Sequence, residues 1–114
     1  MTAIQERVWT PVCRHADLLP ERGAAALLPL GVQVALFRTH DGQVHALANV
    51  DPFSGAAVLS RGIVGDRAGR QVVVSPIYKQ AFDLRSGECL DDPAVSVEVY
   101  PARVVDDVVQ VCSP

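Results

Sequence analysis

The chain has 114 residues, a formal net charge of −3 and an isoelectric point near 5.5, and 49% of its residues are hydrophobic. A chain of this length fits a single domain, residues 1–114, with enough apolar side chains for a buried core. No apolar run approaches the ~20 residues that cross a bilayer, and no block of Lys or Arg offers a surface for nucleic acid or an anionic membrane. We therefore expect neither a membrane nor a nucleic acid as partner.

The N-terminal segment lacks the basic stretch followed by an apolar stretch that marks a secretion signal. We therefore expect a cytoplasmic protein. Its three cysteines, Cys13, Cys89 and Cys112, are an odd number and lie far apart in the sequence. In a cytoplasmic chain this pattern favours reduced thiols over a disulfide framework.

Short apolar segments bounded by Gly, Pro or Asp recur along the chain and predict β-strands. In chain order these segments are residues 8–13, 24–28, 32–38, 44–49, 71–74, 95–100, and 104–105 with 108–112. The strict alternation of apolar and polar residues from Val95 to Tyr100 is typical of a strand with one buried face. No segment predicts a helix of three turns, so the sequence indicates an all-β protein.

Two acidic turns and one long interruption organise these strands. Asp41-Gly42 and Asp106-Asp107 predict the tips of hairpins. Strands at this spacing fit a small antiparallel barrel or sandwich. Residues 51–70 break the rhythm because they are rich in Gly, Pro, Ser and Arg. We expect a long irregular loop there, and loops of this length are commonly functional.

The segments that flank this loop resemble the two ligand loops of Rieske [2Fe–2S] domains. That family binds its cluster through a Cys-x-His loop and a Cys-x-x-His loop, with two thiolates on one iron and two imidazoles on the other. Here the matching segments are Asp51-Pro-Phe-Ser-Gly55 and Ser75-Pro-Ile-Tyr78, and Phe82-Asp83-Leu84 and Gly87 follow the second as in the family. The resemblance implies a Rieske-like small antiparallel barrel or sandwich with a two-loop lobe over residues 49–87.

The four ligand positions of that resemblance hold Asp51, Phe53, Ser75 and Tyr78. A phenylalanine cannot coordinate iron, and Asp, Ser and Tyr do not replace thiolates and imidazoles. We therefore predict no cluster and no other metal in this chain. Asp51 is expected to shape its loop by accepting backbone N–H groups. Phe53 and Tyr78 are expected to lie in contact and fill the cluster space, in which case removing the Phe53 ring would cost ~3–5 kcal/mol.

A second Cys-x-His sequence, Cys13-Arg14-His15, does not supply an alternative ligand set. Neither Cys89 nor Cys112 is followed by a histidine at the required spacing, and the other two histidines flank the predicted Asp41-Gly42 turn. We interpret Cys13 and Cys112 as small apolar residues on strands.

Residues 51–66, 75–84 and 87–93 also resemble the small subunit of bacterial NAD(P)H-dependent nitrite reductase, and this resemblance covers almost the whole chain. In that family the large subunit carries FAD, the nicotinamide site, an iron–sulfur cluster and sirohaem, and reduces nitrite to ammonia. The resemblance implies a cytoplasmic accessory subunit that is not catalytic by itself, has no cofactor of its own, and has the large subunit as its partner.

Charged residues with apolar neighbours on the long loop suggest where such a partner would bind, because interfaces combine apolar anchors with a polar rim. The predicted contact residues are Arg61, Ile63, Val64, Asp66, Arg67 and Lys79. Ser75, Tyr78 and Lys79 form no recognisable catalytic motif, so we predict no catalytic residue. Two alternatives remain open: a ferredoxin-like Rieske electron carrier, and a stand-alone interaction domain for another redox enzyme.

Overall fold

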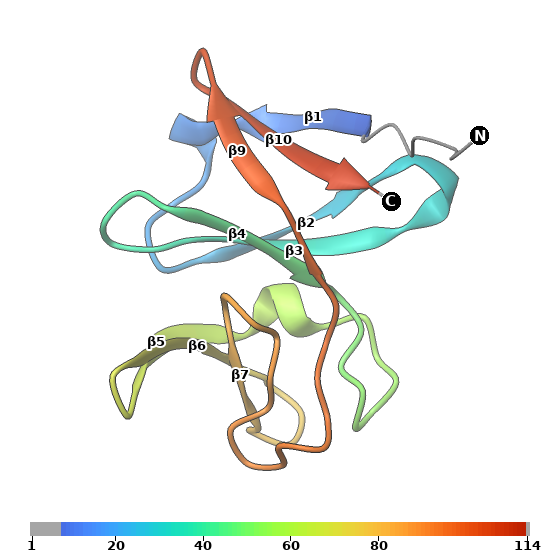
Figure 1. The fold of residues 1–114 in the computed structure, drawn as a ribbon, viewed down its shortest axis with the longest axis vertical. Coiled ribbons are helices and arrows are strands. Elements are labelled where there is room, and N and C mark those ends of the chain that lie inside the picture. The colour runs from blue at the N-terminus through green and yellow to red at the C-terminus, as the bar shows by residue number, and fades with distance from the viewer. Residues whose placement is uncertain (1–7, 114) are drawn as a thin grey trace, which may run out of the picture.

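A computed structural model describes residues 8–113 and shows strands joined by turns (Figure 1). No α-helix occurs in this range; three short 3-10 turns do, η1 (His15–Asp17), η2 (Pro29–Gly31) and η3 (Leu59–Arg61). No described segment is a helix long and apolar enough to cross a membrane. The strands are β1 (Val8–Arg14), β2 (Gly23–Leu27), β3 (Gln33–Arg38), β4 (Val44–Ala48), β5 (Ile63–Arg67), β6 (Arg70–Val74), β7 (Ala81–Asp83), β8 (Val99–Tyr100), β9 (Ala102–Val105) and β10 (Val108–Ser113).

These strands form three antiparallel sheets stacked along the long axis of the molecule (Figure 1). The first has the order β1-β10-β9, the second β2-β3-β4-β8, and the third β5-β6-β7. The second sheet lies between the other two, and the third belongs to a lobe of loops at the opposite end from β1 and β10. The predicted all-β, antiparallel, Rieske-like fold is confirmed, although the sheets do not close into one barrel.

Strand β3 is the centre of the packing because both of its faces are buried. Val34 and Leu36 contribute to a core shared with the first sheet, whereas Ala35 and Phe37 contribute to a core shared with the lobe. Successive residues of a strand point to opposite faces, so one strand serves both cores. The lobe core contains Ala35, Phe37, Leu47, Leu59, Val64, Val73, Phe82, Leu84, Cys89 and Val97.

Both predicted hairpin tips are confirmed. Asp41-Gly42 lies in the turn between β3 and β4, and Asp106-Asp107 joins β9 to β10. Asp106 and Asp107 have φ values of 50° and 67°. Two successive residues with positive φ are the signature of the two-residue turn that matches the twist of a hairpin.

The expectation of an irregular loop over residues 51–70 is wrong in its second half. Ile63–Arg67 forms β5, which pairs with β6 across a turn at Ala68-Gly69, where both residues have positive φ. Only Val64 of β5 is buried, so the strand leaves no alternating pattern in the sequence. Conversely, the strand predicted over residues 95–100 pairs in a ladder only at Val99–Tyr100. The short strand β7 was not predicted at all.

Candidate functional site

The lobe contains the first of the two loops that resemble ligand loops. Asp51, which follows β4, is fully buried. Its backbone N–H donates to the carbonyl of Ala56 at 2.8 Å, and its carbonyl accepts the N–H of Gly55 at 2.7 Å. Its Oδ1 accepts the N–H of Phe53 at 2.8 Å. Gly55 has φ 74°, a conformation that glycine adopts without strain. As predicted, the Asp51 carboxylate shapes this loop.

The second loop, which follows β6, repeats the same backbone pattern. The N–H of Ser75 donates to the carbonyl of Gln80 at 2.9 Å, and the carbonyl of Ser75 accepts the N–H of Lys79 at 3.1 Å. Lys79 has φ 64° and therefore occupies the position that Gly55 has in the first loop. The two loops are thus two copies of one tight turn.

A hydrogen bond joins the first residues of these two turns. The hydroxyl of Ser75 donates to Oδ2 of Asp51, and both side chains are fully buried. These are the two positions at which the Rieske resemblance places the cysteines. Because a buried carboxylate without donors is costly, the Ser75 hydroxyl and the Phe53 N–H satisfy Asp51 where water cannot. The lobe is therefore held together by an oxygen–oxygen contact at this point.

The two positions that resemble histidine ligands differ from each other. Phe53 is partly buried against the lobe core, and its ring centroid lies 6.2 Å from that of Phe82 at an interplanar angle of 46°. Tyr78 is 60% exposed. The prediction that both rings fill a common space is therefore wrong for Tyr78, because the tight turn at Ser75–Gln80 directs its side chain to the surface. Phe53 packs on Phe82 instead.

The residues at these four positions do not fit a [2Fe–2S] cluster. The two sulfur positions hold a carboxylate and a hydroxyl that are bonded to each other, and neither Phe53 nor Tyr78 offers a nitrogen. Within residues 8–113, no three His, Cys, Asp or Glu side chains are placed to hold a metal ion. No chemical step through a cluster can be assigned to these residues.

The remaining cysteines and histidines have separate environments. All three cysteines are free, and Cys13 is half-buried on β1. His15 Nε2 lies 3.0 Å from the carbonyl oxygen of Gly42. Burial lowers the pKa of His45, and the nearby Arg85 guanidinium lowers it further. The neutral form of His45 is therefore favoured, and the cysteines and histidines do not converge on one site.

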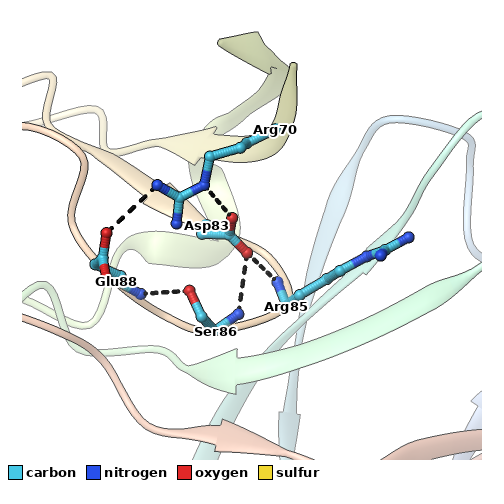
Figure 2. A network of polar contacts seen from close by, with 5 residues as sticks. All are labelled: Arg70, Asp83, Arg85, Ser86 and Glu88. Carbon is cyan, nitrogen blue, oxygen red and sulfur yellow. Dashed lines mark hydrogen bonds and ion pairs between the residues drawn. The ribbon is translucent and has the colours of Figure 1, made fainter. Parts of the chain in front are cut away.

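A third tight turn, which the sequence analysis missed, follows β7 (Figure 2). The carbonyl of Asp83 accepts the N–H of Gly87 at 2.8 Å, and its Oδ1 accepts the N–H of Arg85 at 2.7 Å. Arg70 Nε donates to Asp83 Oδ2 at 2.7 Å, and Arg70 also pairs with Glu88 at 3.3 Å. The spacing Asp-x-x-x-Gly, common to Asp51 and Asp83, was the signal in the sequence that could have revealed this repeat.

The Asp83 carboxylate anchors this third turn electrostatically. Burial raises the pKa of Asp83, but the N–H of Ser86, the Arg70 guanidinium and the N–H of Arg85 together lower it below its ordinary value. The ionised carboxylate therefore favours the folded state. That contribution is present at neutral pH and is lost as the pH falls through the acid range.

The residues predicted to contact a partner differ in their exposure. Arg61, Asp66 and Lys79 are exposed, and Ile63 is 72% exposed. Val64 is only 8% exposed and belongs to the lobe core, so its prediction as a contact residue is wrong. The cause is the unpredicted strand β5, in which Val64 faces the lobe core and its neighbours Ile63 and Gly65 point to the opposite face.

Arg67 is engaged within the chain. Its guanidinium binds the Asp91 carboxylate through two hydrogen bonds of 2.7 and 3.0 Å. This pair lowers the pKa of Asp91 below its ordinary value. Arg67 therefore ties β5 to the segment after β7, although its side chain is 49% exposed. The exposed members of the predicted set without an ion pair to residues 8–113 are Arg61, Ile63, Asp66 and Lys79.

Comparison with known proteins identifies the class to which this fold and lobe belong. The Rieske-like [2Fe-2S] domain family matches residues 8–112. A crystal structure from Mycobacterium tuberculosis, described as an NADH-dependent nitrite reductase small subunit, superposes with a TM-score of 0.94 and 61% identity over 96% of this chain and 98% of that one.

A relative of known function identifies the family within this class. The nitrite reductase (NADH) small subunit of Escherichia coli K12 is 48% identical over 103 residues, which cover 90% of this chain and 94% of that protein. The chain therefore belongs to the family of NADH nitrite reductase small subunits. The nitrite reductase [NAD(P)H] large subunit of Klebsiella oxytoca is also 40% identical over 102 residues, 90% of this chain but only 10% of that protein.

The Asp51–Ser75 contact gives a first prediction. Replacing Ser75 by Ala leaves a buried carboxylate oxygen without its donor, and we expect the free energy of unfolding to fall by about 1–3 kcal/mol. Ser54→Ala is the matched control, because that hydroxyl only accepts an N–H within its own loop and should cost less than about 1 kcal/mol. Urea denaturation of both variants measures the difference. Equal losses would show that the contact does not hold the lobe.

The environments of the two aromatic residues give a second prediction. Phe53→Ala removes a ring that packs on Phe82 and should lower the free energy of unfolding by about 2 kcal/mol or more. Tyr78→Ala removes an exposed ring and should change it by no more than about 0.5 kcal/mol. Thermal and urea denaturation compare the two variants. A loss at Tyr78 as large as that at Phe53 would mean that Tyr78 is packed in the folded protein.

Proposed function

We propose that this chain is the small, non-catalytic subunit of a cytoplasmic NAD(P)H-dependent nitrite reductase, which reduces nitrite to ammonia. On this proposal the chain carries no cofactor, and the flavin, iron–sulfur and sirohaem groups reside in the large subunit. Three free thiols are in keeping with a reducing compartment. At the positions where a redox subunit would need iron ligands, the lobe has the Asp51–Ser75 hydrogen bond. No group of His, Cys, Asp or Glu among the described residues is placed to hold a metal ion.

The match to the Klebsiella large subunit is the observation that carries this proposal. About a tenth of that protein resembles 90% of this chain, so a domain of this kind is part of the same polypeptide as a large subunit. A domain that is fused in one protein and separate in another commonly acts at the same place. This favours a subunit that docks on its partner over an interaction domain for an unrelated redox enzyme.

The docking surface that we propose contains the exposed residues of the predicted set that form no ion pair with residues 8–113: Arg61, Ile63, Asp66 and Lys79. Ile63 supplies an exposed apolar side chain, and the other three residues are charged, which is the mixed composition of an apolar anchor and a polar rim. Lys79 lies at the tip of the second tight turn with its backbone in the left-handed region. Its turn is fixed to the first loop by the Asp51–Ser75 contact.

Iron content separates this proposal from a ferredoxin-like carrier. Protein produced with iron and sulfide supplied should be colourless above 400 nm and contain far less than one iron per chain, because the four ligand positions lack thiolates and imidazoles. A related Rieske ferredoxin prepared in parallel serves as the positive control. Stoichiometric iron that survives gel filtration would support the carrier and contradict the proposal.

Association with the large subunit tests the proposed docking. The chain should co-purify with its native large subunit, and the complex should oxidise NAD(P)H in a nitrite-dependent way. The triple variant Arg61→Glu, Ile63→Ala, Lys79→Glu should fold as the parent does but bind at least about tenfold more weakly, because it loses an apolar anchor and reverses two charges.

A matched control comes from the opposite end of the molecule. Arg14→Glu with Arg103→Glu and Val104→Ala also reverses two charges and truncates an exposed apolar side chain, but on the first sheet. This control should bind and support turnover as the parent does. If the lobe variant supports full turnover, the docking surface lies elsewhere. If the parent itself does not bind the large subunit, the proposed function is wrong.

A further inference from the structure

A groove of about 440 Å³ lies beside the lobe, where the start of β2 meets η3 and the start of β5. Arg22 lines it from the central sheet, and Arg61 and Ile63 line it from the lobe. Glu21 and Ser60 also line it, and we call this feature the Arg22–Arg61 groove. Arg61 and Ile63 are predicted contact residues, and nothing in the sequence joins them to Arg22.

One glycine brings the walls of the groove together. A side chain at Gly23 would overlap the carbonyl oxygen of Ser60. The backbone at the start of β2 therefore packs directly against η3, which places Arg22 and Arg61 on one groove although they are far apart in the sequence. Gly62 is also closely packed, but against the carbonyl oxygen of Val74 within the lobe.

The two arginines that line this groove have no ionic partner among the residues that the structure describes. Neither Arg22 nor Arg61 forms an ion pair with any residue in the range 8–113, whereas Arg67 and Arg70 both do. Both of the groove arginines are exposed. In a protein with a net charge of −3, two unpaired guanidinium groups beside one exposed isoleucine form a local cationic surface with an apolar anchor.

We propose that the Arg22–Arg61 groove receives an acidic segment of the large subunit, which makes it the part of the docking surface that determines affinity and orientation. This inference rests on the proposed function. Guanidinium groups bind carboxylates through two parallel hydrogen bonds, so a segment with two acidic residues matches the two arginines. An apolar residue of the same segment would contact Ile63.

Glu21 is the acidic residue that lines the groove. Its carboxylate lies 3.9 Å from Nδ1 of His40, and its backbone has φ 62° with a 2.6 Å hydrogen bond from its N–H to the carbonyl of Arg38. A carboxylate of the partner would be repelled by Glu21 and attracted by Arg22 and Arg61, which favours binding on the arginine side of the groove.

Binding of the purified large subunit to this chain, measured at about 50 mM and 300 mM NaCl, tests the inference. Arg22→Glu should weaken binding about tenfold at low salt, and Arg22→Glu with Arg61→Glu should weaken it further. The double variant should also lose most of the salt dependence of the parent, because screening acts on the charge pairs that it removes. Arg22→Lys with Arg61→Lys, which keeps the charge but not the planar fork, should bind with intermediate affinity.

Arg14→Glu with Arg85→Glu is the matched control, because it makes the same change in net charge at exposed arginines outside the groove. Circular dichroism and thermal unfolding check that each variant folds, and Arg22→Gln with Arg61→Gln replaces the double reversal if that variant does not. If the parent fails to bind, the proposed function itself is wrong.

Two results would contradict the inference that this groove binds the large subunit and leave the proposed function intact. In the first, the parent and the Arg22→Glu, Arg61→Glu variant bind equally well. In the second, the Arg14→Glu, Arg85→Glu control weakens binding as much as the groove variant does, which would show that only net charge matters. Weak binding by the groove variant together with parental binding by the control supports the inference.

Discussion

The burial of β3 on both faces is the constraint on which the rest of the structure depends. Its inner residues are shared between two cores, one with the first sheet and one with the lobe. Burying a large aliphatic or aromatic side chain contributes roughly 1.5–3 kcal/mol, so the lobe is anchored mainly by apolar contact with Phe37 and Leu47. The lobe therefore has a source of stability that does not involve a metal.

The tight turns of the lobe are held next to each other by this apolar core. Each turn begins with a residue whose side-chain oxygen lies near the N–H group two residues on, at Asp51, Ser75 and Asp83. The first two turns are joined by a hydrogen bond from the Ser75 hydroxyl to the Asp51 carboxylate, at the positions where a Rieske domain has its cysteine ligands. A hydrogen bond is far weaker than metal coordination, but it suffices here because the apolar core already brings the loops together. The fold of a redox domain thus persists as a scaffold for binding.

The arginines on the surface fall into two groups, according to whether they stabilise the fold. The arginines that stabilise the fold, Arg67 and Arg70, are bound to carboxylates of the same chain. The arginines of the Arg22–Arg61 groove form no ion pair with residues 8–113, and they lie where Gly23 allows the central sheet and the lobe to meet. Charge and shape at this junction are available for recognition, and we propose that association with a large subunit uses both.

The sequence by itself determined the all-β fold, the hairpin tips, the position of the lobe and the loss of the iron ligands, because these depend on local alternation, turn residues and side-chain chemistry. It did not determine that Tyr78 faces outward, which depends on the local tight turn at Ser75–Gln80. Nor did it determine that Val64 is buried or that Arg22 and Arg61 line one groove. These two features depend on packing between distant segments, as does the bond between Asp51 and Ser75, 24 residues apart. Only the packing of β2, η3 and β5 against one another decided which side chains meet and which remain free for a partner.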